Sequence, residues 1–448
     1  MPEKMRGLTD GYVRFTNGST SKAKIKICSQ CRIGKVHVLN KWTIFGVLFL
    51  TWLVWLIWYL KVHHSAEKDP PYGNLVVLPK ELANEKGAYC LDGSPPGYYF
   101  RKGRNEGKNS WILFLAGGGW CYNISDCHDR SFSALGSSKF FPTQVLFDGF
   151  LANDEKTNAD FYDWNVAYLA YCDGASFSGN ADMPVKYKDR NIYFRGKRVL
   201  DLLLDYLLQH GLSEADRVII GGVSAGGIAV YIHADYIKSK LPVSTTVQAF
   251  SDAGYIPDIR NITNFQNIRI VFQRIYNFQQ VKGSLNKACL DANDRSSQWK
   301  CFFPQYSFQY IKTPMFVLNS AYDYWTLWYA LDLRCYHSEC DTKGKYYYTY
   351  YQKEFMALMQ QVFSSTKDGV YISSCYAHSQ ASNGEWTNYI VNGTTPQEAF
   401  SDWYFSRKSV GESKYLDCMT PGCNPTCDWS LEFYNTTKAK LSTTDFFI

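Results

Sequence analysis

Short apolar runs alternate with longer amphipathic segments along most of the chain. The apolar runs are typical of buried strands and lie at 111–115, 166–171, 217–222, 314–320 and 369–375, the final one being the last strand we expect. The segments with apolar residues at helical spacing lie at 194–210, 225–241 and 348–365. Strands that alternate with helices predict an α/β fold with a mostly parallel sheet flanked by helices.

A longer apolar run, 42–60, contains no charged residue. As a helix it would be about 28 Å long, close to the thickness of a bilayer core, so it predicts a transmembrane helix. Nine basic residues but only Glu3 and Asp10 precede it, which keeps the tail in the cytosol. We therefore expect a single-pass type II membrane protein of the Golgi or cell surface. Its predicted parts are a basic tail (1–41), a signal-anchor helix (42–60), a stem (61–72) and one lumenal or extracellular domain (73–448).

The distribution of charge changes the meaning of the formal net charge of +6. Residues 1–41 account for +7, which leaves 38 basic and 39 acidic residues in the remainder. A domain with a net charge of −1 lacks the basic surface that nucleic-acid binding requires. Cys28 and Cys31 in the tail form a C-x-x-C pair, but only His37 lies near as a further zinc ligand, and palmitoylation fits better. We expect no metal and no cofactor.

Twelve of the 14 cysteines follow the predicted membrane helix. An even number in an oxidising compartment predicts disulfide bonds. Four N-x-S/T sequons also lie there and predict glycosylation at Asn123, Asn261, Asn392 and Asn435.

The sharpest chemical signal is Gly222-Val223-Ser224-Ala225-Gly226. It stands between a predicted strand and a predicted helix, which is the context of a nucleophile elbow. The alternative is a glycine-rich turn with an incidental serine. The context favours Ser224 as a catalytic nucleophile.

A serine nucleophile requires a histidine base and an acid that orients it. Of the histidines after Ser224, His233 lies too far along the following helix and His337 lies between Cys335 and Cys340. His378 follows the last predicted strand, where a catalytic histidine belongs. Asp323 follows the preceding strand and is the predicted acid, while Asp252 is the competitor or a brace for the elbow.

Ester hydrolysis also requires donors for the oxyanion. Gly117, Gly118 and Gly119 directly follow the strand 111–115, where the amides of a glycine loop face the nucleophile. We predict an oxyanion hole from the N–H groups of Gly118, Gly119 and Ala225. A phosphate-binding loop is the weaker alternative, because no lysine follows in P-loop spacing.

Nine short motifs in order resemble one known family. They are GGGWC (117–121), YCDGASFSG (171–179), SAGG (224–227), SDAGY (251–255), CFFPQ (301–305), NSAYDYW (319–325), SSCYAHSQ (373–380), DWYFSR (402–407) and CNPTC (423–427). Together they look like the pectin acetylesterase family, a wider group that includes the Wnt deacylase Notum. The plant-type members are more similar than Notum, although plant members usually have cysteine in place of Val223 and often in place of Ser379.

The resemblance implies a disulfide-stabilised α/β-hydrolase-like fold and a serine carboxylesterase with the same triad and oxyanion hole. It further implies the disulfides Cys90–Cys172 and Cys121–Cys127. The implied substrate is an O-acetylated polysaccharide. The alternatives are a Notum-like palmitoleoyl-protein carboxylesterase acting on an acylated secreted protein, and a non-enzymatic carbohydrate-binding ectodomain. Trp120, Tyr255, Phe302 and Phe303 are the expected pocket residues, in a shallow acetyl site or a long acyl tunnel.

Overall fold

A computed structural model describes residues 40–64, 70–382 and 384–442. The chain forms two compact units, Met1–Lys68 and Asp69–Ile448. In the first, the described residues form helix α1 (Lys41–His64). Most of the predicted tail, with Cys28 and Cys31, and residues 65–69 of the predicted stem lie outside the described residues.

The predicted helix over 42–60 is present as α1, but the structure does not support its role as a membrane span. Among the described residues, no helix meets the length and apolar character that a bilayer crossing requires.

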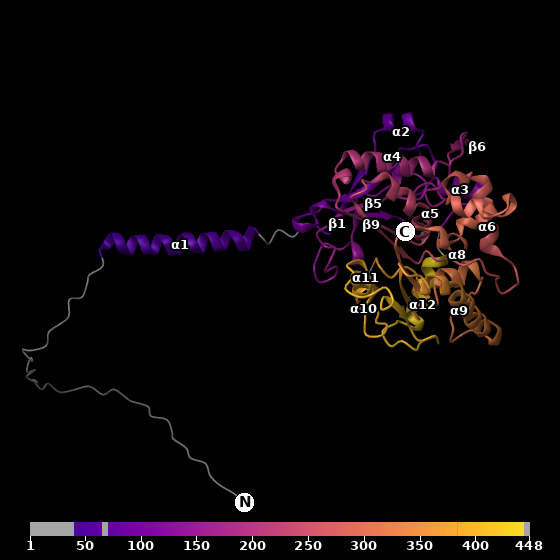
Figure 1. Ribbon diagram of the computed structural model, residues 1–448. Coiled ribbons are helices and arrows are strands. Elements are labelled where there is room, and N and C mark those ends of the chain that lie inside the picture. Colours follow the sequence, from indigo (N-terminus) through magenta and orange to yellow (C-terminus); the bar gives the residue numbers. More distant parts are fainter. Residues whose placement is uncertain (1–39, 65–69, 383, 443–448) are drawn as a thin grey trace, which may run out of the picture. The chain divides into compact units, whose positions relative to one another are not determined.

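The second unit is built on a large sheet, and Figure 1 labels β1, β5 and β9 among its strands. Its order in the described chain is β12-β11-β10-β9-β8-β3-β5-β2-β1-β4. Neighbours from β12 to β5 are parallel, and β2, β1 and β4 extend the sheet with antiparallel pairs. The predicted α/β fold with a mostly parallel sheet is therefore confirmed.

The elements have the following bounds. The sheet contains β1 (Tyr72–Val77), β2 (Gly97–Arg101), β3 (Ser110–Leu115), β4 (Gln144–Leu146), β5 (Asn165–Leu169), β8 (Arg217–Val223), β9 (Thr246–Asp252), β10 (Met315–Ser320), β11 (Gly369–Ser373) and β12 (Lys414–Leu416), and β6 (Val185–Tyr187) pairs with β7 (Arg190–Ile192). The helices are α2 (Lys80–Lys86), α3 (Ile124–Arg130), α4 (Gly196–Gln209), α5 (Ala225–Lys240), α6 (Asn267–Phe278), α7 (Lys287–Asp291), α8 (Pro304–Ser307), α9 (Thr342–Phe363), α10 (Glu385–Asn388), α11 (Pro396–Tyr404) and α12 (Leu431–Ser442).

Side chains of the central strands alternate between two cores, as the period of a strand requires. Leu113 and Leu115 of β3 pack into the core that holds α4, α5 and α9. Ile112 and Phe114 of the same strand pack into the other core, with Phe400 of α11. Because both faces are covered, the strands read in sequence as continuous apolar runs.

The structure corrects the prediction of the last strand. Residues 369–373 form β11, but β12 follows and pairs with it in parallel. Its three residues, Lys414, Tyr415 and Leu416, alternate in exposure and lack the apolar run of a central strand. An edge strand needs no such run, since one of its sides has no neighbour.

Six disulfides join all twelve cysteines that follow α1. They are Cys90–Cys172, Cys121–Cys127, Cys289–Cys301, Cys335–Cys340, Cys375–Cys427 and Cys418–Cys423. The first two are the pairs that the resemblance implied. Cys375–Cys427 ties the loop after β11 to the C-terminal segment.

One of the four predicted glycosylation sites is buried in this fold. Asn261 is only 3% exposed, and its side-chain oxygen accepts hydrogen bonds from the backbone N–H groups of Thr263 and Phe265. A glycan requires an accessible amide, so burial makes Asn261 the least favourable of the four predicted sites. Asn392 and Asn435 are exposed, and Asn123 is half-buried as the N-cap of α3, so these three sites stay predictions.

Candidate active site

Ser224 occupies the turn between β8 and α5, at the carboxyl edge of the parallel strands. Its backbone has φ 56° and ψ −121°, in the region that favours glycine. Close packing forces this turn, because a Cβ on Gly222 would lie 2.3 Å from the carbonyl oxygen of Gly226. The Ser224 N–H donates to the backbone oxygen of Asp252 at the end of β9 (2.9 Å). A strained serine held in this way is typical of a nucleophile elbow.

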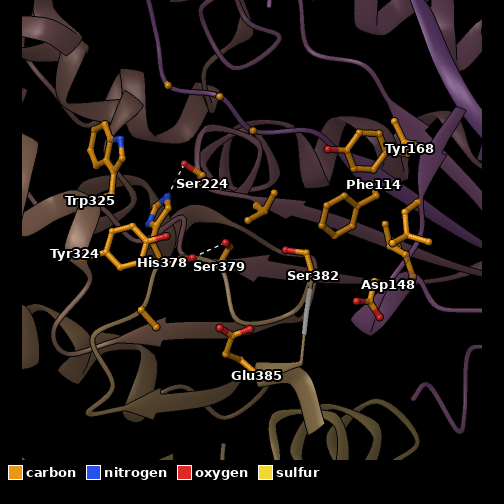
Figure 2. A pocket seen from close by; sticks show the side chains of 18 of the residues that line it. Phe114, Asp148, Tyr168, Ser224, Tyr324, Trp325, His378, Ser379, Ser382 and Glu385 are labelled. Carbon is orange, nitrogen blue, oxygen red and sulfur yellow. Dashed lines mark hydrogen bonds between the residues drawn. The ribbon is translucent and has the colours of Figure 1, made fainter. Parts of the chain in front are cut away.

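The loop after β11 brings His378 to Ser224. The two atoms His378 Nε2 and Ser224 Oγ are 2.8 Å apart, and Figure 2 shows the side chains pointing toward each other. On the other side of the ring, His378 Nδ1 lies 2.6 Å from Asp323 Oδ2. One hydrogen-bonded chain thereby joins His378 to Ser224, 154 positions away in the sequence, and to Asp323, 55 positions away.

Asp323 itself is held by the turn that follows β10. It is 1% exposed, and its second carboxylate oxygen accepts from the Thr326 N–H at 2.8 Å. Because both carboxylate oxygens accept hydrogen bonds, the orientation of the Asp323 side chain is fixed. The bond from Asp323 in turn fixes the orientation of the His378 imidazole.

Asp252, the competing acid, lies at the end of β9, next to β10, and binds the backbone of the loop that carries His378. Its Oδ2 accepts from the Ala381 N–H at 2.7 Å. Burial raises the pKa of Asp252 to about 7. Asp252 therefore binds the backbone of the loop that carries His378, whereas the hydrogen bond to the imidazole is made by Asp323.

The glycine loop after β3 packs against the elbow. A Cβ on Gly117 would lie 2.5 Å from the Val223 carbonyl oxygen and 3.1 Å from Ser224 Cβ, so only glycine permits this approach. Gly118 and Gly119 have φ of 138° and 63°. All three glycines line the cavity at Ser224.

A hydrogen-bond chain fixes this loop relative to α5. Tyr171 Oη donates to the Gly119 carbonyl oxygen (2.8 Å) and accepts from the Ser176 N–H (3.0 Å). Ser176 Oγ donates to the Ala225 carbonyl oxygen (2.7 Å) and accepts from Trp120 Nε1 (2.8 Å). The motif 171–179 was visible in the sequence, but this role depends on contacts across 49 and 56 residues.

The cavity has a volume of about 730 Å³ and extends to both sides of Ser224. Tyr324 and Trp325 lie beside the His378 ring, with Trp325 stacked on it at 6.0 Å between centroids. In Figure 2, Phe114 and Tyr168 lie on the side of Ser224 away from Trp325. Sequence reasoning missed these aromatic residues, although Tyr324 and Trp325 directly follow the predicted acid.

The four aromatic residues predicted to line the pocket do not line this cavity. Trp120 is 8% exposed, and Tyr255, Phe302 and Phe303 are fully buried. Three of the rings pack around Phe272 of α6, with centroid distances of 5.0 Å to Trp120, 4.8 Å to Phe302 and 4.5 Å to Phe303. The Tyr255 ring packs against Tyr231 and Phe355 instead. Large apolar side chains beside a glycine loop can pack inward or line a pocket, and here they form core.

A serine hydrogen-bonded through histidine to a buried aspartate, on a mostly parallel sheet, is the arrangement of the α/β-hydrolase class. Residues 69–428 match a family model described as Pectinacetylesterase. The chain belongs to this family and is a carboxylic ester hydrolase.

Named relatives agree with this assignment. The chain is 36% identical to pectin acetylesterase 5 of Arabidopsis thaliana over 77% of its own length and 83% of the relative's. It is 38% identical to pectin acetylesterase 4 of the same plant, over 77% and 86%. A more distant relative is the palmitoleoyl-protein carboxylesterase NOTUM of Schmidtea mediterranea, at 28% identity over 72% and 62%.

Proposed function

We propose that the chain is a serine esterase that removes O-acetyl groups from a polysaccharide, with Ser224, His378 and Asp323 as catalytic triad. The observation that carries the proposal is the hydrogen-bonded chain Ser224 Oγ, His378 Nε2, His378 Nδ1, Asp323 Oδ2, with contacts of 2.8 and 2.6 Å. Ester hydrolysis follows from membership of the family. Two parts of the site remain to be assigned: the donors that bind the oxyanion and the space that holds the acyl group.

The reaction proceeds through an acyl-enzyme. Asp323 keeps the His378 proton on Nδ1, so Nε2 accepts the Ser224 hydroxyl proton as Oγ attacks the ester carbonyl. The tetrahedral intermediate collapses, and the imidazolium transfers the proton to the leaving sugar oxygen. Water then attacks the acetyl-serine with His378 as base, and acetate is released.

The oxyanion is held by the N–H groups of Gly118, Gly119 and Ala225. Gly118 and Gly119 line the cavity at Ser224. Ala225 is the first residue of α5, where backbone N–H groups lack an intrahelical acceptor. The N-terminal end of the helix dipole adds a favourable field for an anion at that position.

Ser176 is a positioning residue for this oxyanion hole, because its hydroxyl group bonds both to Ala225 and to Trp120, the residue after Gly119. We expect Ser176→Ala to lower kcat by about tenfold and leave KM within about twofold, since misplaced donors weaken the transition state more than the bound ester. Steady-state kinetics on p-nitrophenyl acetate measures both constants.

Ser178→Ala is the matched control, since Ser178 is equally buried and donates to the Ala175 carbonyl oxygen within its own turn. If Ser176→Ala raised KM with kcat unchanged, the positioning role would be refuted. Combination with Tyr171→Phe should give less than the product of the two separate effects, because both act on one hydrogen-bond chain.

The packing next to the site favours a short acyl group. Trp325 lines the cavity, and its ring contacts Trp120 at 5.5 Å between centroids. Phe272 packs against Trp120, and Phe302 and Phe303 pack against Phe272, so the space next to Trp120 is filled by aromatic rings. A long acyl chain directed into this region would have to displace core aromatic residues, at several kcal/mol.

A chain-length series of p-nitrophenyl esters tests the acyl preference. We expect kcat/KM to fall at least about tenfold between the C4 and C8 esters, because each added methylene must displace packed side chains. Acetate release from acetylated pectin and acetylated xylan, measured beside the series, checks the polysaccharide. A maximum at C8 or longer would favour the second candidate, a palmitoleoyl-protein carboxylesterase.

That second candidate rests on the NOTUM relative and on the apolar half of the cavity, where Phe114, Leu151 and Val223 could contact an acyl chain. A non-enzymatic ectodomain no longer fits a chain of this family. The disulfides support placement of the Asp69–Ile448 unit in an oxidising compartment, outside the cytosol.

A further inference from the structure

Apart from His378, the charged side chains that line the cavity at Ser224 are acidic. Asp148 follows β4 and Glu385 begins α10, and both line the cavity (Figure 2). Neither lysine nor arginine occurs among the described residues that line it. Asp148 is exposed and Glu385 is half-buried. A sugar bound at the proposed ester site therefore lies beside two acidic side chains.

Two described cations adjoin lining residues and make other contacts. Arg101 is 7% exposed behind the cavity wall, with its guanidinium 5.4 Å from the centre of the Phe147 ring and Nη1 donating to the Leu151 carbonyl oxygen. Lys438 follows the cavity residue Thr437, and its ammonium group lies over the Tyr434 ring. Neither is among the residues that line the cavity, although Arg101 offsets part of the negative field.

The rest of the lining suits a sugar without charge. Tyr168 and Trp325 offer aromatic faces, which pack against the apolar C–H faces of sugar rings. Ser382 offers a hydroxyl group, and Asp148 and Glu385 accept hydrogen bonds from sugar hydroxyls, which are stronger for an ionised acceptor. A uronic acid would instead bring its own carboxylate beside two others, and the described lining residues include no lysine or arginine to pair it.

We propose that Asp148 and Glu385 make the enzyme selective for uncharged O-acetylated sugars, including esterified uronates, over uronates with free carboxylates. This inference rests on the proposed deacetylase function and names its substrate class. Pectin contains both kinds of uronate, so the selectivity directs the enzyme to methyl-esterified regions or to neutral acetylated glycans.

The sharpest test uses one polymer in two charge states. O-acetylated polygalacturonate is compared as the free acid and as the full methyl ester, with equal acetyl content, at low ionic strength and with the full chain. We expect kcat/KM on the methyl ester to be about five- to tenfold higher than on the free acid. This ratio corresponds to the repulsion of one carboxylate by two unit charges within about 8 Å in water. Added 0.5 M NaCl should reduce this ratio toward one by screening.

The double variant Asp148→Asn/Glu385→Gln should bring the ratio close to one without salt. Glu214→Gln is the matched control and should keep the wild-type ratio, because Glu214 precedes β8 at the end of the strand opposite Ser224. Equal rates on both polymers, faster hydrolysis of the free acid, or a ratio unaffected by salt and by the double variant would each overturn the inference. Absence of acetate release from either polymer and from p-nitrophenyl acetate would overturn the deacetylase function itself.

Discussion

Replacing Ser224 by alanine should reduce kcat on p-nitrophenyl acetate by about 10⁵-fold, because no other group can form the acyl-enzyme. The folded state should keep its stability, with Tm within about 2 °C of the wild type. The Ser224 backbone has φ 56°, and alanine tolerates this conformation about as well as serine does. The side chain lost contributes one contact, to His378.

Initial rates and thermal unfolding of the same preparation separate a chemical defect from a folding defect. Ser239→Ala is the control on the same helix, since Ser239 is exposed on α5 and donates to the Tyr236 carbonyl oxygen. A fluorophosphonate probe should label the wild type and the control but not the Ser224 variant. Activity of the Ser224 variant above a few per cent would remove the serine from the mechanism.

Replacing Asp323 by asparagine should lower kcat by about 10⁴-fold, through the loss of the negative charge that stabilises the His378 imidazolium. Asparagine also offers an N–H to His378 Nδ1, which favours the tautomer with its proton on Nε2 and so blocks the base. KM should change little, because Asp323 is 1% exposed and does not line the cavity. The pH profile of the residual activity should lose the limb that reports the histidine base.

Asp252→Asn is the matched comparison, since both acids are buried at the carboxyl ends of neighbouring strands. The pKa of Asp252 is raised to about 7, so much of this residue is already neutral near that pH. The asparagine oxygen can still accept from the Ala381 N–H, as Asp252 does at 2.7 Å. We expect kcat to fall by less than about tenfold. The reverse order of the two effects would make Asp252 the triad acid.

The positions of the main strands and helices were readable because each depends on local pattern. Residues 217–222 and 225–241 correspond to β8 and α5, whose buried positions produce long apolar stretches in the sequence. Helix α9 begins at Thr342 rather than near 348, because Asp341 caps it and its first turns are polar on the outside. Periodicity finds the buried part of an amphipathic helix and misses its exposed start.

The prediction of the pocket residues failed because the answer depended on distant neighbours. Phe302 and Phe303 have the composition of a pocket wall, but contacts with Phe272 bury them. Asn261 satisfies the sequon rule, yet its side chain closes a turn inside the fold. Whether such a side chain is buried depends on contacts with distant residues, which the local sequence does not specify.

The sequence by itself determined the fold class, the family resemblance and the candidates Ser224, Asp323 and His378, because strand period, turn chemistry and triad order are local or sequential properties. Tertiary structure alone decided which acid contacts the histidine, how Ser176 links the two sides of the proposed oxyanion hole, and that Asp148 and Glu385 share one cavity. These facts concern atoms a few ångströms apart on segments 49 to more than 200 residues apart, and packing of the whole sheet brings them together.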